Sequence, residues 1–231
     1  MRRVSLVFSV ITFAAFLVDL YMVFIYAPKE RFMGDLQRLM YFHVASAWAA
    51  FLAFTIVFFA SIAYLKTRQF KWDRLSVSAA ELGVLFTSLV LVTGPIWARP
   101  VWNTWWSWDP RLTTTLILWF IYFAYLLLRY STEGDERRGR LAAIFAIIGY
   151  IDVPIVHFSV TWWRSIHPNV ITNTQMNMDP AMTITLLVTG LVFFMLFSML
   201  LLYRLQLEEQ LAMLLQLREK ILGSFNFTSR R

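Results

Sequence analysis

The sequence contains no cysteine and few charged residues. Among its 231 residues, none can form a disulfide, a thiolate metal site or a catalytic thiol. Charged residues make up 15% of the chain, whereas roughly 25% is usual in soluble domains. Hydrophobic residues reach 59%, and the mean hydropathy is +0.60. This composition is too apolar for an ordinary soluble domain and indicates a membrane protein.

Six apolar runs account for most of the chain. They extend over residues 4–27, 39–65, 75–97, 112–129, 141–159 and 181–203. A helix crosses the hydrocarbon core with roughly 20 residues, and none of the runs alternates with the period of two that barrel strands require. We therefore predict an all-α polytopic membrane protein with six transmembrane helices. Residues 1–204 are expected to form the transmembrane domain, and residues 205–231 a cytoplasmic amphipathic tail.

The distribution of lysine and arginine predicts the orientation. The first run is too long for the apolar core of a signal peptide and lacks a small-residue cleavage pattern, so we expect it to remain as the first helix. If the N-terminus is cytoplasmic, fifteen of the 21 lysines and arginines fall on cytoplasmic segments. The other six are Lys29, Arg31, Arg38, Arg99, Arg111 and Arg164. The positive-inside rule therefore predicts that both termini are cytoplasmic.

Two further features on the predicted cytoplasmic side bear on partners. The net charge of +7 follows from the asymmetry of the loops, so we expect no nucleic-acid partner. The tail carries leucines spaced to share one helical face, at positions 207, 211, 214, 215 and 222. This face is typical either of an interfacial helix lying on membrane lipid or of a docking helix for a cytoplasmic partner, and both interpretations stay open.

Tryptophan gathers on the predicted outer side, above all in the stretch WNTWWSWDPRLT at residues 102–113. Seven of the ten tryptophans lie at or beside outer segments, namely Trp97, Trp102, Trp105, Trp106, Trp108, Trp162 and Trp163. An aromatic belt would populate both membrane interfaces, so it leaves an outer surplus unexplained. Flat amphipathic rings suit a large, flat, apolar ligand. If residues 102–109 are helical, Trp102, Trp105, Trp106 and Asp109 share one face.

Asp109, Pro110 and Arg111 follow these tryptophans directly. Aspartate is a good N-cap and proline suits the first helical position, so the pair is expected to start the fourth helix. Asp179 and Pro180 are expected to do the same before the sixth. Arg111 is a cation in the first turn of this helix, where the helix dipole disfavours positive charge. We therefore expect an anion nearby. Asp109 or a ligand carboxylate can supply it.

The three histidines also fall on the outer side. His43 lies near the start of the second helix and His157 near the outward end of the fifth, while His167 lies in the following loop. A single intramembrane histidine is more often an interhelical hydrogen-bonding residue, but two at one depth indicate a ligand pair. Pro154 is expected to kink the fifth helix and so to re-aim His157.

No third metal ligand is evident near this pair, so axial ligation of a haem is favoured over a non-haem site. A haem also carries two propionates, for which Arg38, Arg99 and Arg111 are the candidate partners.

The same residues carry a family resemblance. WNTWWSWDPRLT resembles the WWD signature of haem-handling membrane proteins. YFHVASAW and DVPIVHFSVTWWRSIHP resemble the histidine segments of the heme exporter protein C (CcmC) family of cytochrome c maturation. The resemblance implies that His43 and His157 ligate haem b non-covalently, with no ligand role for His167. It further implies that residues 97–112 form the haem platform and that Arg38 and Arg111 face the propionates. Asp152 stands where the family pattern has asparagine.

The resemblance also implies a location, partners and a function. The expected location is the bacterial inner membrane. The expected partners are CcmA-type and CcmB-type subunits of an ABC transporter, a CcmD-type small membrane protein and a CcmE-type haem chaperone. The chain is expected to bind haem at the extracytoplasmic surface and transfer it to that chaperone, without enzymatic activity of its own. Two alternatives stay open: a transporter conducting haem past Asp19, Glu81 and Asp152, and a bis-histidine membrane electron carrier.

Overall fold

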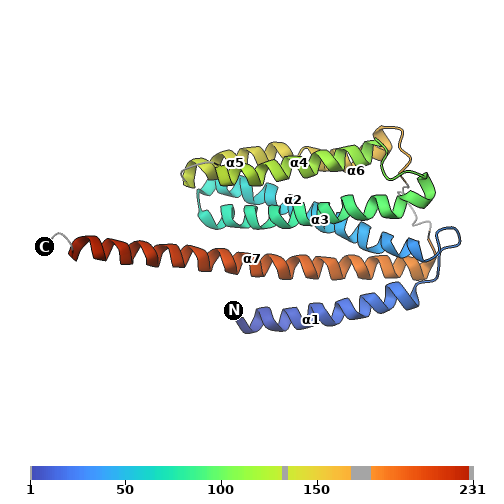
Figure 1. Cartoon of the computed structure of the whole chain (residues 1–231), viewed down its shortest axis with the longest axis horizontal. Helices are drawn as coiled ribbons and strands as arrows, with labels where there is room; N and C mark the ends of the chain where they lie inside the picture. Colours follow the sequence, from blue (N-terminus) through green and yellow to red (C-terminus); the bar gives the residue numbers. More distant parts are fainter. Residues whose placement is uncertain (1, 132–134, 168–177, 229–231) are drawn as a thin grey trace.

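The fold is an elongated bundle of helices (Figure 1). A computed structural model describes residues 2–131, 135–167 and 178–228. In chain order the elements are α1 (Arg2–Tyr21), the π-helical turn η1 (Met22–Tyr26), the 3-10 turn η2 (Asp35–Arg38), α2 (Leu39–Thr67), α3 (Phe70–Trp102), α4 (Pro110–Ser131), α5 (Asp135–Gly149), α6 (Asp152–Trp162) and α7 (Pro180–Thr228). The described residues contain no β-strand, which agrees with the predicted all-α class.

Six helical segments are long and apolar enough to cross a membrane, so the six predicted spans are confirmed. They cover Ser5–Tyr26, Asp35–Thr67, Phe70–Trp102, Pro110–Arg129, Glu136–Trp162 and Pro180–Leu211. The second and third extend several residues beyond the predicted runs. In particular, α3 continues to Trp102 and takes up the beginning of the tryptophan-rich stretch.

The fifth span is interrupted, as the sequence predicted. α5 ends at Gly149 and α6 begins at Asp152, two residues before Pro154. Proline lacks the backbone N–H that would bond the carbonyl four residues earlier, and its ring crowds that carbonyl, here that of Tyr150. The Tyr150 carbonyl instead accepts a hydrogen bond of 3.0 Å from the Val153 backbone N–H. The outward part of the span thereby becomes a separate helix.

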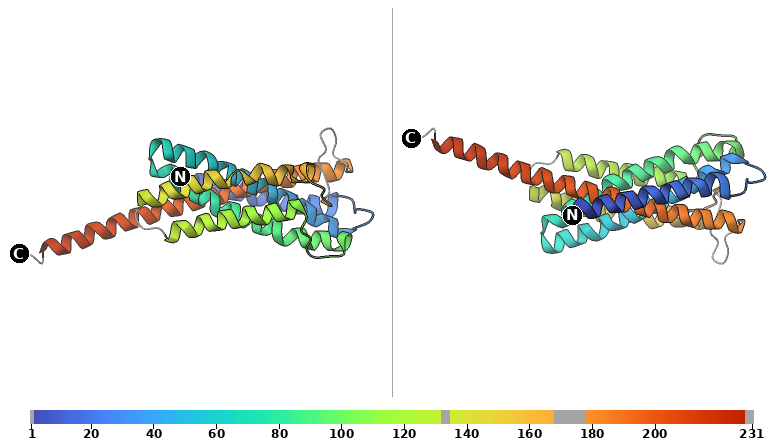
Figure 2. Two further views of the ribbon diagram at one scale, coloured as in Figure 1. Left: turned by 90° about the horizontal axis from the view of Figure 1, so that it is seen from above. Right: turned by 90° about the horizontal axis from the view of Figure 1, so that it is seen from below.

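Both ends of the described chain lie at the same end of the bundle (Figures 1 and 2). The opposite end, which we call the loop end, carries residues 27–38, 103–109 and 163–167. The tryptophan-rich stretch and the segment that follows α6 therefore meet at one end of the molecule. That the loop end is extracytoplasmic stays a prediction from the lysine and arginine count.

The predicted tail is a continuation of the sixth span. α7 runs without a break through residues 204 and 205 and extends beyond the other helices (Figures 1 and 2). Leu207, Leu211 and Leu214 are each more than half exposed. The side chains of Leu215 and Leu222 lie outside the described part of the chain. The interfacial and docking roles of this helix both stay predictions.

Two acidic side chains inside the spans each form a hydrogen bond or ion pair with α7. Asp19 on α1 accepts a hydrogen bond of 2.6 Å from Thr189 on α7. Glu81 on α3 forms a bidentate ion pair with Arg204 on α7. Asp152 lies in the first turn of α6, where a carboxylate interacts favourably with the helix dipole. The contacts of Asp19 and Glu81 tie α7 to α1 and to α3.

Close helix packing around Gly190 yields a stability prediction. A Cβ atom added at this glycine of α7 would lie 2.5 Å from Cζ3 of Trp48 on α2. Gly190→Ala should therefore lower the free energy of unfolding by about 1–3 kcal/mol, the usual cost of overpacking a core. Thermal unfolding in detergent measures this change. The double variant Gly190→Ala/Trp48→Phe is the control, because a smaller ring should restore most of the loss. Equal destabilisation in both variants would contradict this explanation.

Candidate functional site

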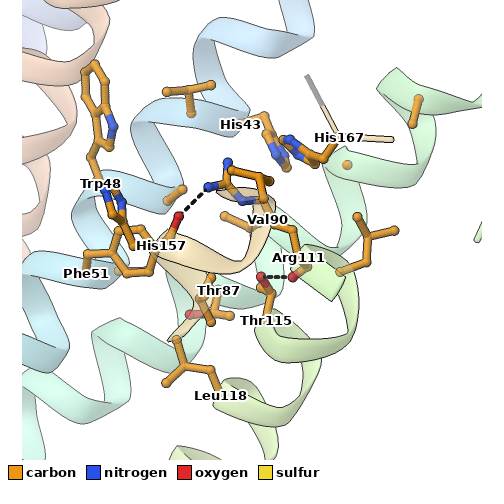
Figure 3. A pocket seen from close by; sticks show the side chains of 18 of the residues that line it. His43, Trp48, Phe51, Thr87, Val90, Arg111, Thr115, Leu118, His157 and His167 are labelled. Atoms are coloured by element: carbon orange, nitrogen blue, oxygen red, sulfur yellow. Dashed lines mark hydrogen bonds between the residues drawn. The ribbon is translucent and has the colours of Figure 1, made fainter. Parts of the chain in front are cut away.

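A cavity of about 500 Å³ lies between four helices in the half of the bundle near the loop end (Figure 3). Its volume falls within the roughly 300–1,000 Å³ of typical small-molecule sites. α2, α3, α4 and α6 contribute most of the walls, and the segment after α6 contributes His167. All three histidines and Arg111 line it, together with the aromatic side chains Trp48, Phe51, Trp97, Trp102 and Phe158. The cavity is therefore apolar with a few convergent polar groups.

His43 on α2 is buried, and its protonation state follows from its partner. Its Nδ1 atom lies 2.9 Å from Oγ1 of Thr93 on α3. The Thr93 hydroxyl donates its own hydrogen to the Leu89 carbonyl at 2.6 Å, so it acts as acceptor toward the ring. Nδ1 of His43 then carries the hydrogen, which leaves the lone pair on Nε2. An imidazole fixed in this way is prepared to ligate a metal through Nε2.

Neighbouring residues of α3 fix the position of the same ring. Gly94 lets the backbone approach closely, because a Cβ atom there would lie 3.1 Å from Cε1 of His43. The Trp97 ring lies 6.0 Å from the imidazole, between centroids. Trp97 is in turn held by a hydrogen bond of 3.1 Å from Nε1 to Oε1 of Gln37. α3 therefore sets the location of His43 as well as its tautomer.

His167 approaches His43 from the loop end. Both residues line the cavity, and their side chains are drawn in the same part of it in Figure 3. The Trp102 ring meets His167 in an edge-on arrangement, with 6.2 Å between centroids. His167 was predicted to lie on the outer side without a ligand role. The structure places it in the lining of the same cavity as His43.

His157 occupies a different wall. It is exposed, and its ring lies near Phe51 and Trp48 in Figure 3. The ring packs edge-on against Phe158, 4.9 Å between centroids. Its backbone carbonyl accepts a hydrogen bond of 2.9 Å from Nη2 of Arg111. All three histidines line the same cavity, and the pairing of His43 with His157 stays a prediction.

Arg111 brings a cation into the cavity at the start of α4. Its Nη2 atom donates the hydrogen bond to the His157 carbonyl. Its Nε atom is buried and has no hydrogen-bond partner among the described residues. A buried guanidinium donor without an acceptor is costly, and a carboxylate or phosphate is its best partner. This arrangement is consistent with the prediction that Arg111 has an anionic partner.

Asp109 combines two roles, only the first of which was predicted. Its Oδ1 accepts a 3.0 Å hydrogen bond from the Arg111 backbone N–H, which confirms the N-cap. Its Oδ2 accepts 2.8 Å bonds from the Ser165 hydroxyl and the Ile166 backbone N–H. The Ser165 hydroxyl oxygen also accepts a bond of 3.0 Å from the His167 backbone N–H. The buried carboxylate thus ties the segment that carries His167 to the start of α4.

The conditional helix over residues 102–109 does not form. α3 ends at Trp102 because Asn103 adopts the left-handed conformation, with φ of 53°. Residues 103–109 then follow an irregular path, so Trp105, Trp106 and Asp109 share no helical face with Trp102. Trp105 and Trp108 are 60% and 77% exposed, and Trp106 packs edge-on against Trp108. Among these four tryptophans, Trp102 is the one that lines the cavity.

The other two predicted arginines are engaged outside the cavity walls. Arg38 bonds the Val23 carbonyl and forms an ion pair of 2.9 Å with Asp35. Arg99 donates a 2.7 Å hydrogen bond to Asn103 Oδ1, and its guanidinium lies 5.7 Å from the Trp105 ring centroid. Both side chains brace the loop end. In this arrangement Arg111 is the predicted arginine that reaches the cavity.

Fold and site together define a multi-pass helical membrane protein with a histidine-lined aromatic cavity near one end of its bundle. Residues 1–217 match the family profile described as heme exporter protein C, so the chain belongs to the heme exporter protein C (CcmC) family. The protein is a multi-pass protein of the inner membrane.

Several relatives share this similarity. Heme exporter protein C of Bradyrhizobium diazoefficiens is 35% identical over 74% of the chain and 66% of its own length. The protein of that name from Escherichia coli is 37% identical over 68% of the chain and 64% of its own length. A Marchantia polymorpha mitochondrial protein, named as ccmC-like in cytochrome c biosynthesis, is 40% identical over 61% of the chain and 59% of its length. The chain thus spans about two thirds of the length of these relatives or slightly less.

Proposed function

We propose that this protein binds haem b in the cavity at the loop end and passes it to an acceptor during maturation of c-type cytochromes. The observation that carries the proposal is the meeting of His43, His167 and Arg111 in one aromatic cavity. The names of the relatives, which refer to haem export and cytochrome c biosynthesis, support the same cargo.

The residues present fit a haem better than a bare metal ion. The described residues contain no group of three or more histidine, cysteine, aspartate or glutamate side chains able to hold a metal. Two imidazoles suffice for haem iron, because the porphyrin supplies the other four nitrogens. The cavity adds flat walls from Trp97 and Trp102, and Arg111 adds a donor for a propionate.

We assign the axial pair to His43 and His167 rather than to His43 and His157. The lone pair of His43 Nε2 is available because Nδ1 is engaged by Thr93. His167 lines the same cavity from the segment after α6, where the Trp102 ring packs edge-on against it. Since His167 belongs to a surface segment, a partner can compete for this iron bond without entering the bundle.

The transfer itself requires no covalent chemistry by this chain, so we propose a carrier rather than an enzyme. With the loop end outside, the acceptor is a CcmE-type haem chaperone on the extracytoplasmic side. CcmA-type and CcmB-type ABC transporter subunits and a CcmD-type small protein complete the proposed assembly. Ligand exchange at His167 then releases the haem, and ATP hydrolysis in the partner subunits is the proposed energy source.

The two alternatives find less support. Conduction through the bundle would need polar residues along a path, but Asp19 and Glu81 are bonded to α7, and neither they nor Asp152 are among the residues that line the cavity. An electron carrier relays electrons between haems across the membrane. Here all three histidines of the chain line one cavity near one end.

Haem titration of the purified full-length protein in lipid nanodiscs tests the proposal. We expect one haem per chain and the absorption spectrum of a six-coordinate, low-spin, bis-histidine iron. A soluble haem-chaperone domain added afterwards should acquire the haem. Absence of saturable binding would refute the proposed function, and binding without release to any acceptor would refute the carrier role.

Thr93→Val gives a more local prediction. Valine has a similar shape but cannot accept the hydrogen bond from His43 Nδ1, so the tautomer is no longer fixed. We expect haem affinity to fall about tenfold, at the lower end of the 10–100-fold cost of losing a partner of a ligating histidine. Thr93→Ser, which keeps the hydroxyl, is the matched control. Equal affinities for the serine and valine variants would contradict the role of the hydroxyl group.

A further inference from the structure

His157 is an exposed imidazole inside a membrane span. It belongs to the segment Glu136–Trp162 and lies five residues, or about 7.5 Å of helix rise, before its end. A polar side chain at such a depth is costly, which makes it a candidate functional residue. Its ring lines the cavity and is also exposed, so it stands where the cavity opens.

The opening lies along the seam between α2 and α6. Toward the end of the bundle that carries both chain termini, α2 contacts the fifth span through a 3.0 Å hydrogen bond between Thr55 Oγ1 and the Tyr150 hydroxyl. The rings of Phe58 and Tyr150 also stack there, 4.4 Å apart between centroids. Beyond this point α6 packs mainly against α4, and no hydrogen bond or ring contact joins α2 to α6 among the described residues. The contacts across the seam thus lie near Tyr150, and toward the loop end residues of both helices line the cavity instead.

Side chains on both edges of the open part line the cavity without being buried. On α2 these are Ala47, Trp48 and Phe51, which are half-buried, and on α6 His157, Phe158 and Thr161, which are exposed. The edges are mostly apolar and face the side of the bundle, where the bilayer lies. A flat apolar molecule in the membrane thus meets an aromatic edge with one iron-binding group.

We propose that this seam is a lateral portal through which haem passes from the bilayer into the cavity, with His157 as a transient iron ligand on the way. The inference rests on the proposed function and adds the source and route of the cargo. Neutral His157 donates a ring lone pair to the iron at the portal. That bond breaks as the iron takes the His43 Nε2 lone pair inside, and no electron is transferred. His157 is then free again, which agrees with its place outside the His43–His167 pair.

The first test compares two sources of haem for the same nanodisc-embedded protein. Haem is offered either dissolved in the bilayer of donor vesicles fused with the nanodisc lipid, or as albumin-bound haem in the surrounding water. For His157→Ala, uptake from lipid should slow about tenfold, the effect of losing ~1.4 kcal/mol of stabilisation along the path. The final bis-histidine spectrum should match that of the wild type. Unchanged uptake from lipid would overturn the proposal, and so would equal slowing from both sources.

The second test closes the seam and uses the absence of cysteine from the chain. Ala47→Cys and Val160→Cys, one on each edge, are bridged by a bifunctional methanethiosulfonate reagent, which a reductant removes. Bridging should block uptake from lipid, and reduction should restore it. Thr55→Cys with Tyr150→Cys is the matched control, because the helices already meet there and bridging should change little. Full uptake through a bridged seam would overturn the portal.

These outcomes remain distinct from failure of the proposed function. If the wild type binds no haem from either source, the function fails before the route is in question. If His157→Ala binds at the normal rate but loses the bis-histidine spectrum, His157 is an axial ligand and the transient role is wrong.

Discussion

His43→Ala and His167→Ala should each abolish the low-spin bis-histidine spectrum of the haem-loaded protein, whereas His157→Ala should retain it at saturation. The reason is that Thr93 engages Nδ1 of His43 and leaves Nε2 as its ligating atom, while we propose His167, not His157, as the second ligand. Removal of one axial ligand leaves a five-coordinate iron, which changes the absorption bands completely. Absorption spectra of the three variants, loaded with equal haem, measure the effect.

The three substitutions serve as controls for one another, since each removes one imidazole from the same cavity. Added imidazole should restore the low-spin bands of His43→Ala and His167→Ala, which shows that the cavity itself is intact. If instead His157→Ala loses the bands and His167→Ala keeps them, the pair is His43 and His157, as the family resemblance first implied.

The spans, the kink and the caps could all be predicted because each depends on nearby residues. Apolar runs define the helices through their length, and Pro154 disrupts the helix just before it. Asp109 and Asp179 each accept a hydrogen bond from the backbone N–H two residues later, as predicted N-caps do. Such features need no knowledge of how distant segments meet.

The partner of His43 could not be predicted in this way. His157 and His167 are ten residues apart, and both lie on the outer side. Which of them faces His43 depends on how the chain turns back after Trp162. That turn is fixed by hydrogen bonds from Ser165 and Ile166 to Asp109, more than fifty residues away. Only the folded arrangement contains this information.

The conditional helix over residues 102–109 does not form, for a local reason that the spacing of the tryptophans does not reveal. The spacing of its tryptophans fits a helical face, but Asn103 tolerates the left-handed conformation and ends α3. The arginines show a different limit, because their hydrogen-bond and ion-pair partners decide which of them reaches the cavity. Arg38 is drawn to the Val23 carbonyl and to Asp35, and Arg99 to Asn103, so charge alone did not identify the one that reaches the cavity.

Asp109→Asn should lower haem affinity toward the upper end of the 10–100-fold range for residues that orient a ligating histidine. Asparagine still caps α4, because its carbonyl oxygen can accept the bond from the Arg111 backbone N–H. Its amide group, however, is a donor and faces the Ile166 backbone N–H, which also donates. The bond from the Ile166 backbone N–H is therefore lost and the tie to the segment of His167 is weakened, while the helix start is preserved.

Comparison with Asp109→Ala separates the two roles. Alanine removes the cap as well, so it should cost about 1 kcal/mol of additional stability in thermal unfolding. Haem affinity should fall to a similar extent in both variants, because both release the segment that carries His167. Haem titration and unfolding of the two proteins side by side provide the measurement. Wild-type affinity in Asp109→Asn would mean that His167 keeps its place without the carboxylate, and the assigned tie between α4 and this segment would then be wrong.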